Sequence, residues 1–253
     1  SFNVLQIGDS CTDRYNIGSV DRLSPEAPVP VLKINESYDV KGMAANVNLN
    51  LINLNLYADF VTNSEQIIKS RFIDKRSGQH LLRVDDDIEI SQWDGKTPDP
   101  LETYDAIIIS DYDKGFLKYT DIERIVDSVR CPVFIDTKKK DLAEIAPPFR
   151  ADHVYIKINE LEFKNAHSIS DNLIVTLGDR GAQYNGQIYP TKQAEVMDVC
   201  GCGDTFLAAL AVQYLFTKDI EKAIMFANVA AGLTVQHRGN YAPSYDEIRH
   251  AGY

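Results

Sequence analysis

The residue types best suited to chemistry lie in one short stretch, Asp198-Val199-Cys200-Gly201-Cys202-Gly203-Asp204. Its two glycines allow a tight turn, and the apolar run 205–212 that follows has the composition of a buried helix. The N–H groups at such a helix start have no acceptor within the helix, so they attract anions such as phosphate. Asp204 would stand beside a bound anion as a general base. The alternative is that Asp204 only caps a core helix.

Cys200 and Cys202 permit a second interpretation of the same stretch. A thiol at a helix start has a lowered pKa and can bind a metal or do redox chemistry. The other two cysteines, Cys11 and Cys131, are distant in sequence, and no histidine cluster lies near enough to complete a zinc site. Four scattered cysteines in 253 residues do not make a disulfide framework, which predicts a reducing compartment.

The amino-acid composition limits which classes of binding partner are compatible with the chain. The chain has 26 basic and 37 acidic residues and a formal net charge of -11. This argues against nucleic-acid binding, because phosphate backbones require positive surfaces. A small anionic substrate is still compatible if basic residues cluster locally. No apolar run reaches membrane-spanning length and no leader pattern opens the chain, so we expect a cytoplasmic protein without a membrane partner.

Short apolar runs alternate with amphipathic stretches, most regularly after residue 105, which predicts a mainly parallel sheet with helices on both faces. Polar residues follow each predicted strand. Because the carboxyl ends of parallel strands meet at one edge of the sheet, these residues predict a ligand site there. The polar and glycine residues at these strand ends are Asp9, Asp13, Asp111, Lys114, Asp136, Lys138, Asn159, Glu162, Thr176, Gly178 and Gly181.

Two segments, 14–40 and 69–90, do not fit this alternation. The first holds three prolines within six residues, which exclude a helix, and the second holds two short predicted strands joined by a turn. We expect both segments to contribute strands to a small β-sheet that forms a lid or a dimer surface. The second segment also carries Lys69 and Arg71 in a basic cluster. That cluster is a candidate anion site, and a solvated hairpin face is the alternative.

Taken together, these motifs resemble the ribokinase-like carbohydrate kinases, or PfkB family, from Val4 to near Arg249. The stretch 198–204 corresponds to that family's Asp-Thr-x-Gly-Ala-Gly-Asp. The resemblance implies an α/β fold in a single kinase domain, residues 1–253, with a mainly parallel sheet, helices on both faces and a small β lid. It implies that Asp204 deprotonates a sugar hydroxyl. It also implies an anion hole made by the N–H groups of Gly201, Cys202 and Gly203.

The same resemblance implies ATP and Mg²⁺ as cofactors and leaves open a monovalent cation such as K⁺. Asn159 and Glu162 match the family's Asn-x-x-Glu pair, which is linked to the metal. The nucleotide-binding residues that it implies are Asn159, Thr176, Gly178, Gly181 and Asn228. The chain has neither a Gly-x-x-x-x-Gly-Lys-Ser/Thr phosphate loop nor the protein-kinase motif set, so phosphoryl transfer requires a different architecture.

Within the family, the chain is most similar to the kinases that act on the anomeric hydroxyl of D-glycero-D-manno-heptose 7-phosphate in ADP-heptose synthesis. The similarity rests on the proline-rich string 24–31, on residues 42–47 and on Ser110-Asp111-Tyr112 with Lys114-Gly115. The implied sugar ligands are Asp9, Asp13, Gly42 and Asn46, and the implied ligands of the 7-phosphate are Lys69, Arg71, Lys114 and Lys138. A kinase for another sugar, such as ribose or fructose, is an alternative. So is a catalytically weak regulator that binds a sugar phosphate or a nucleotide.

The chain departs from the family pattern at several positions. Met43 replaces the second glycine of the sugar-binding pair and places a side chain near the substrate. Val199, Cys200 and Cys202 replace small or hydroxyl residues, although backbone donors survive these changes. The segments after Asn63 and after Glu162 are short, which predicts a compact form of the fold. Exposed lid edges predict a homodimer.

Overall fold

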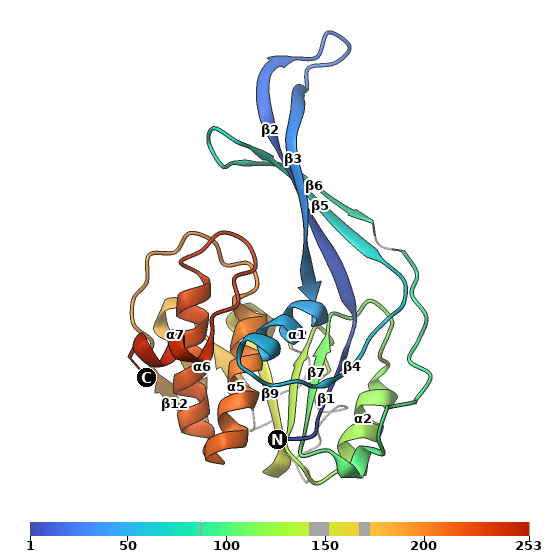
Figure 1. Ribbon diagram of the computed structural model, residues 1–253, viewed down its shortest axis with the longest axis vertical. Helices are drawn as coiled ribbons and strands as arrows, with labels where there is room; N and C mark the ends of the chain where they lie inside the picture. The colour runs from blue at the N-terminus through green and yellow to red at the C-terminus, as the bar shows by residue number, and fades with distance from the viewer. Residues whose placement is uncertain (87, 142–151, 167–172, 253) are drawn as a thin grey trace.

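The computed structural model describes residues 1–86, 88–141, 152–166 and 173–252. They form an α/β body with a narrow β arm that projects from one end (Figure 1). An eight-stranded sheet runs through the body in the order β12-β11-β10-β9-β8-β7-β1-β4. Its strands are β1 (Val4–Gly8), β4 (Asp59–Val61), β7 (Ala106–Asp111), β8 (Val133–Thr137), β9 (Val154–Asn159), β10 (Leu173–Thr176), β11 (Ala182–Tyr184) and β12 (Gln187–Tyr189).

The strands from β4 to β10 are parallel, as the alternation in the sequence predicts. β1, β7 and β8 are buried along their whole length, which explains their nearly continuous apolar sequences, since both faces are covered. β11 and β12 form an antiparallel hairpin at the edge. Asn185 and Gly186, both with positive φ, make its two-residue turn.

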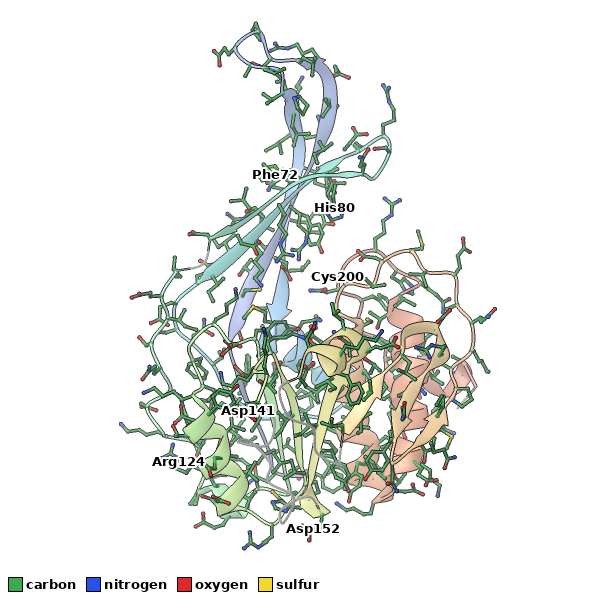
Figure 2. All side chains as sticks on the ribbon, turned by 180° about the vertical axis from the view of Figure 1, so that it is seen from behind. Phe72, His80, Arg124, Asp141, Asp152 and Cys200 are labelled. Carbon is green, nitrogen blue, oxygen red and sulfur yellow. The ribbon has the colours of Figure 1, made fainter. Side chains whose placement is uncertain are left out.

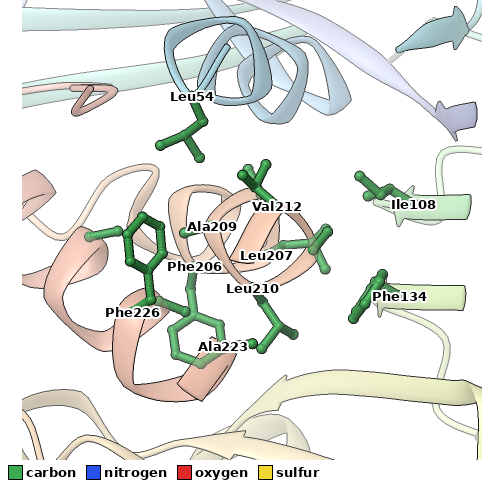
Figure 3. Close-up of a cluster of buried hydrophobic side chains, with 14 of the residues drawn as sticks. Leu54, Ile108, Phe134, Phe206, Leu207, Ala209, Leu210, Val212, Ala223 and Phe226 are labelled. Carbon is green, nitrogen blue, oxygen red and sulfur yellow. The ribbon is translucent and has the colours of Figure 1, made fainter. Parts of the chain in front are cut away.

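One face of the sheet packs against a helical layer formed by α1 (Ala44–Asn53), α5 (Cys202–Thr217), α6 (Ile220–Thr234) and α7 (Tyr245–His250). α5 is apolar all round because it lies between the sheet and the other helices. Figure 3 shows Leu207 and Leu210 of α5 directed toward the strands that carry Ile108 and Phe134, with Phe226 of α6 on the far side. This packing fixes the start of α5 over the carboxyl edge of the sheet.

Among the described residues, the opposite face is covered by α2 (Tyr119–Ser128) and by an irregular segment that ends in the short 3₁₀ helix η1 (Leu101–Thr103). Trp93 in that segment is buried, and its backbone N–H donates to the carbonyl of Phe116 at 2.8 Å. The guanidinium of Arg124 on α2 stacks over the Trp93 ring at 4.8 Å. An irregular chain therefore covers part of the sheet beside α2. α4 (Glu160–Asn165) and η3 (Gly178–Arg180) follow β9 and β10.

The projecting arm is a four-stranded sheet, here called the lid, in the order β3-β2-β5-β6. Its strands are β2 (Ser10–Leu23), β3 (Pro30–Met43), β5 (Ile67–Asp74) and β6 (His80–Asp86). They include most of the predicted lid segments, but β2 begins at Ser10, one residue after Asp9. Asp13 is therefore a lid residue and does not lie in a turn after β1. Figure 2 shows Cys200 at the end of the body that faces the lid strands carrying Phe72 and His80.

Among the described residues, no helix has the length and apolar character needed to cross a lipid bilayer.

Candidate active site

Asp204 lies in the first turn of α5 and is almost completely buried. Both of its carboxylate oxygens accept hydrogen bonds from neutral groups. Oδ1 accepts from the Tyr112 hydroxyl at 2.5 Å, and Oδ2 accepts from Nδ2 of Asn46 at 2.9 Å. Burial raises the pKa of Asp204 to about 6, although these two donors hold the pKa lower than burial alone would. A carboxylate with a pKa near 6 suits a general base that works near neutral pH.

The loop before α5 can approach its neighbours closely only because it contains glycines. Gly201 has φ +75°, and a Cβ there would lie 2.8 Å from Oδ1 of Asn240 and 2.9 Å from Nδ2 of Asn46. A Cβ on Gly203 would lie 2.8 Å from Nζ of Lys157. The first N–H groups of α5 therefore start directly above a buried lysine. The Cys202 N–H donates to the Val199 carbonyl at a long 3.4 Å, and N–H groups at a helix start together with an ammonium group favour a phosphate.

A row of polar side chains crosses the sheet beneath this loop. Ser110, Asp136 and Lys157 are register partners on β7, β8 and β9, and all three are buried. Nζ of Lys157 donates to Oδ2 of Asp136 at 2.8 Å. Burial disfavours the charged form of Lys157, but the neighbouring Asp136 raises the Lys157 pKa above its usual value. Oδ1 of Asp136 and Oγ of Ser110 have no hydrogen-bond partner among the described residues.

Asp9, predicted as a sugar ligand, lies between β1 and β2 and has no exposed surface. Its carboxylate accepts hydrogen bonds from the backbone N–H groups of Tyr112 at 2.6 Å and Lys114 at 2.8 Å. Burial, and then the charge of Asp111, raises the pKa of Asp9 to about 6. In this conformation Asp9 holds the loop after β7, and contact with a sugar stays a prediction.

Several charged residues of the lid lie on the face that turns toward the loop before α5. Alternation along the strands places Asp13 of β2 with Lys69 and Arg71 of β5 on this inner face. Arg71 donates to Asp13 at 2.6 Å, and Nδ2 of Asn240 lies 3.3 Å from the same carboxylate. Lys69 is buried and has no hydrogen bond or ion pair with any described residue. The inner face therefore holds a buried ammonium group that makes no direct ion pair, although the charge of Asp85 lies opposite it on β6.

Gly42 and Met43 end β3 directly beneath the lid. A Cβ on Gly42 would collide with the carboxylate of Asp13 and the thiol of Cys11. Met43 has φ +54°, a conformation that favours glycine. The Met43 side chain is buried in a small apolar cluster with Cys11 and Ile67. It thus packs under the lid, so the substitution affects backbone strain more than the volume of the sugar site.

Asn159 and Glu162 cap α4 together. Oδ1 of Asn159 accepts from the Glu162 N–H at 2.7 Å, and Glu162 accepts from the Asn159 N–H at 2.8 Å. The other oxygen of Glu162 forms an ion pair with Lys138, whose Nζ also lies 4.0 Å from Asp136. Lys138 therefore lies on this side of the site, apart from Lys69 and Arg71. Glu162 and Asp136 thus already have an ammonium group between them, and Mg²⁺ binding near Glu162 stays a prediction.

A cavity of about 210 Å³ adjoins the loop before α5, which contains Val199, Cys202 and Gly203. It brings together four of the five residues predicted to bind a nucleotide, Thr176, Gly178, Gly181 and Asn228, along with Cys202 and Gly203. Asn159, the fifth, is at the end of β9 in register with Thr176. Nδ2 of Asn228 donates to the Tyr189 carbonyl at 2.9 Å, so this amide shapes the wall of the cavity.

The thiols of Cys200 and Cys202 are poorly suited to metal binding or redox chemistry, the alternative interpretation of this stretch. Burial raises the pKa of Cys200 and of Cys202 above the usual thiol value. The Cys200 thiol contacts Oδ1 of Asn240 at 3.0 Å. Both thiols are half-buried, and a thiol with a raised pKa is a weak nucleophile and a weak metal ligand, so the site favours phosphate binding over thiol chemistry.

Three residues that sequence reasoning gave no role belong to the site: Tyr112, Lys157 and Asn240. Asn240 joins lid and body, because its Nδ2 donates to the Lys41 carbonyl at 2.8 Å. Lys157 interrupts an apolar strand, and a lysine within a buried strand is a signal that could have been used. Tyr112 and Asp204 are 92 positions apart, so only the fold reveals their contact.

The fold and the site together define the class of protein. A family model described as pfkB family carbohydrate kinase matches residues 157–247. The bifunctional protein HldE of Haemophilus influenzae is 31% identical over 303 aligned positions, which cover 98% of this chain. HldE of Pseudomonas fluorescens SBW25 is 30% identical over 300 positions, again covering 98% of the chain. The chain spans 63% of the length of both relatives.

Solved structures show the ribokinase-like fold. Thermotoga maritima ribokinase aligns with a TM-score of 0.73 at 17% identity and covers 99% of each chain. Arabidopsis thaliana ribokinase, complexed with ribose and ATP, aligns with a TM-score of 0.73 at 16% identity and covers 99% of this chain and 98% of its own. Residues 157–247 thus match the pfkB family of carbohydrate kinases, and the chain has the ribokinase-like fold, as the sequence resemblance implied.

The crowding around Gly201 yields a test of the loop. Gly186 has the same φ of +75°, but a Cβ added there would meet nothing within 4 Å, so Gly186→Ala should lower the free energy of unfolding by about 1 kcal/mol through backbone strain alone. Gly201→Ala adds a clash with Asn46 and Asn240, and we expect a loss of about 2–3 kcal/mol. Urea unfolding followed by Trp93 fluorescence measures both. Equal losses would contradict the close approach.

Proposed function

We propose that this chain is an ATP-dependent sugar kinase that transfers the γ-phosphate to a sugar hydroxyl. The observation that carries the proposal is the position of Asp204, a buried carboxylate that lies in the first turn of α5 between the cavity of about 210 Å³ and the polar inner face of the lid. Phosphoryl transfer needs an aligned hydroxyl, a proton acceptor and neutralisation of the phosphate charge. Among the described residues there are candidates to align the sugar hydroxyl, to accept its proton and to neutralise the phosphate charge.

In this proposal Asp204 accepts the proton of the sugar hydroxyl as the oxygen attacks the γ-phosphorus. The N–H groups of Gly201, Cys202 and Gly203 receive the transferring phosphoryl group, and Lys157 beneath them adds positive charge. Thr176, Gly178, Gly181 and Asn228 border the nucleotide. Mg²⁺ held near Glu162 would neutralise phosphate charge, and Asn159 would fix Glu162 through their shared cap. A requirement for K⁺ stays a prediction.

The sugar is proposed to carry a phosphate of its own, as in D-glycero-D-manno-heptose 7-phosphate. The supporting observation is Lys69, a buried ammonium group without an ion-pair partner among the described residues, beside Arg71 on the inner face of the lid. Burying an unpaired charge is unfavourable, so such a group indicates an anionic ligand. The charges of Lys69 and Lys114 both act on Asp85, which places the two lysines near each other. Asp13, Gly42 and Asn46 line the path from Arg71 to Asp204.

Replacement of Asp204 tests the proposed base. Asp204→Asn keeps the shape but cannot accept the proton, so turnover should fall by roughly 10²–10⁴-fold while ATP binding is retained. A coupled assay for ADP and titration calorimetry measure the two quantities. Asp59→Asn is the matched control, because Asp59 also accepts a tyrosine hydroxyl but starts β4, away from the site. Unchanged turnover in Asp204→Asn would remove Asp204 from this role.

Thermal stabilisation by nucleotide or sugar phosphate without any ADP release from the wild type would favour a regulator instead.

A substrate panel tests the phosphorylated sugar. We expect phosphorylation of heptose 7-phosphate over ribose, fructose and fructose 6-phosphate, measured as kcat/KM. Lys69→Met should lower kcat/KM for the phosphorylated sugar by about 10- to 100-fold, because a charge-assisted hydrogen bond is lost. Lys33→Met on the exposed part of β3 is the control. Transfer to ribose or fructose alone would reject the heptose assignment and leave the family assignment intact.

We also propose that the chain forms a homodimer through the lid. β6 is an edge strand, and its outer face carries Leu82 and Val84, which are 58% and 47% exposed. They pair with Phe72 and Ser70 of β5, so Leu82, Val84 and Phe72 form a small apolar patch on the face opposite Lys69 and Arg71. Exposed edge strands with apolar side chains favour pairing with another sheet.

Sedimentation velocity tests the dimer. The wild type should sediment as a dimer at micromolar concentration, and the double change Leu82→Glu with Val84→Glu should give a monomer, because two charges would be buried in the interface. Ile188→Glu on β12 is a control, since Ile188 is 50% exposed on the body. A wild type that is monomeric, or a dimer that survives the lid changes, would contradict the proposed interface.

A further inference from the structure

One tyrosine is hydrogen-bonded to two of the buried carboxylates of the site, Asp204 and Asp9. The hydroxyl of Tyr112 donates to Oδ1 of Asp204, and the backbone N–H of Tyr112 donates to Oδ1 of Asp9 at 2.6 Å. Tyr112 follows β7, whereas Asp204 starts α5 and Asp9 follows β1. The residue thus joins three elements at the carboxyl edge of the sheet, and its phenol reaches the atom that is proposed to receive the proton.

The surroundings of Tyr112 fix its ring. The ring packs against the apolar cluster of Cys11, Met43 and Ile67 at the base of the lid. Nζ of Lys138 lies 5.4 Å from the ring centroid on another side. The Tyr112 phenol therefore has little freedom to leave Asp204 without a movement of the lid base.

The phenol also has a defined protonation state. Burial, and then the charge of Asp204, raises the pKa of Tyr112 well above its usual value. Tyr112 is therefore a neutral donor throughout the working pH range, and a donor to a carboxylate favours the ionised form of that carboxylate. A carboxylate oxygen has two acceptor positions, so Oδ1 can accept from Tyr112 and still accept from a sugar hydroxyl.

We propose that Tyr112 is a positioning residue for the base, whose hydroxyl fixes the Asp204 carboxylate and keeps it ionised while the sugar hydroxyl approaches. The proposal rests on the proposed role of Asp204. The groups that act on Asp204 come from five elements: Asn46 of α1, Tyr112 after β7, Asp136 of β8, Lys157 of β9 and Cys11 of β2. Asp136 and Lys157 are paired with each other and largely offset one another. Loss of the phenol therefore leaves Asn46 as the single hydrogen-bond donor to Asp204 among the described residues.

Tyr112→Phe gives the first test. With one donor lost, the pKa of Asp204 should rise, and because the base works only when ionised, the acid limb of the kcat/KM profile should shift to higher pH. We expect a shift of about half a unit or more, so that activity at pH 5.5 relative to pH 8 falls about threefold further than in the wild type. The Asp9 contribution to the profile stays constant, because Asp9 accepts from the Tyr112 backbone.

Tyr104→Phe is the matched control. Tyr104 is also buried and donates its hydroxyl to an aspartate, Asp59, at 2.8 Å, but it lies before β7 at the opposite edge of the sheet. Both variants lose one buried hydroxyl, so a comparable drop in melting temperature is expected for both. The acid limb should move in Tyr112→Phe alone.

Site-specific incorporation of 3-fluorotyrosine at position 112 keeps the packed aromatic ring and makes the phenol more acidic. The stronger donor should shift the acid limb to lower pH, opposite to Tyr112→Phe. An acid limb that stays at its wild-type position in a folded Tyr112→Phe enzyme, or that moves in the same direction for both replacements, overturns the proposal. This failure is distinguishable from failure of the proposed function, because that failure is reported by full turnover in Asp204→Asn.

Discussion

The arrangement of the site depends on one buried carboxylate that has no ion-pair partner. Asp204 is held by a phenol and an amide, and no salt bridge to it exists among the described residues. A lysine or arginine in direct contact would stabilise the ionised form so strongly that the group would be a poor base at neutral pH. Neutral donors allow burial to raise the pKa to about 6, which keeps Asp204 ionised at neutral pH and still basic. The positive charge of Lys157 makes no salt bridge with Asp204 and lies instead beside Gly203 in the loop before α5.

The position of Asp204 follows from the packing of α5. The helix is apolar all round, so it is driven into the space between the sheet and α6, and its first turn is left at the carboxyl edge of the strands. The loop that precedes it must then turn beside Asn46 and above Lys157, and only glycine fits at positions 201 and 203. The packing of α5 in the core therefore also sets the geometry of the site. It requires the glycines that the motif at residues 198–204 contains.

Much of the fold could be predicted from the sequence because its signals are local. The strand and helix alternation after residue 105 predicts the parallel sheet, and the prolines of residues 25–30 predict the non-helical lid. Residue roles were harder to predict. Asp9 follows a strand, but its oxygens accept from the backbone of residues 112 and 114. Lys138 is one of three consecutive lysines, and only the fold shows that it pairs with Glu162. Such assignments depend on contacts between distant segments, which periodicity does not encode.

The groups proposed to do chemistry are all present, although the chain is shorter than the aligned part of its relative. The alignment with the Haemophilus relative runs over 303 positions although this chain has 253 residues, so the relative holds at least 50 positions that are absent here. The predicted short segments follow β4 and α4. Part of the sheet face behind β7 is covered by the irregular segment around Trp93. The groups proposed to do chemistry come from strand ends, the start of α5 and the inner face of the lid, all of which are present. Arg124 of α2, stacked on Trp93, helps to hold this irregular segment against the sheet.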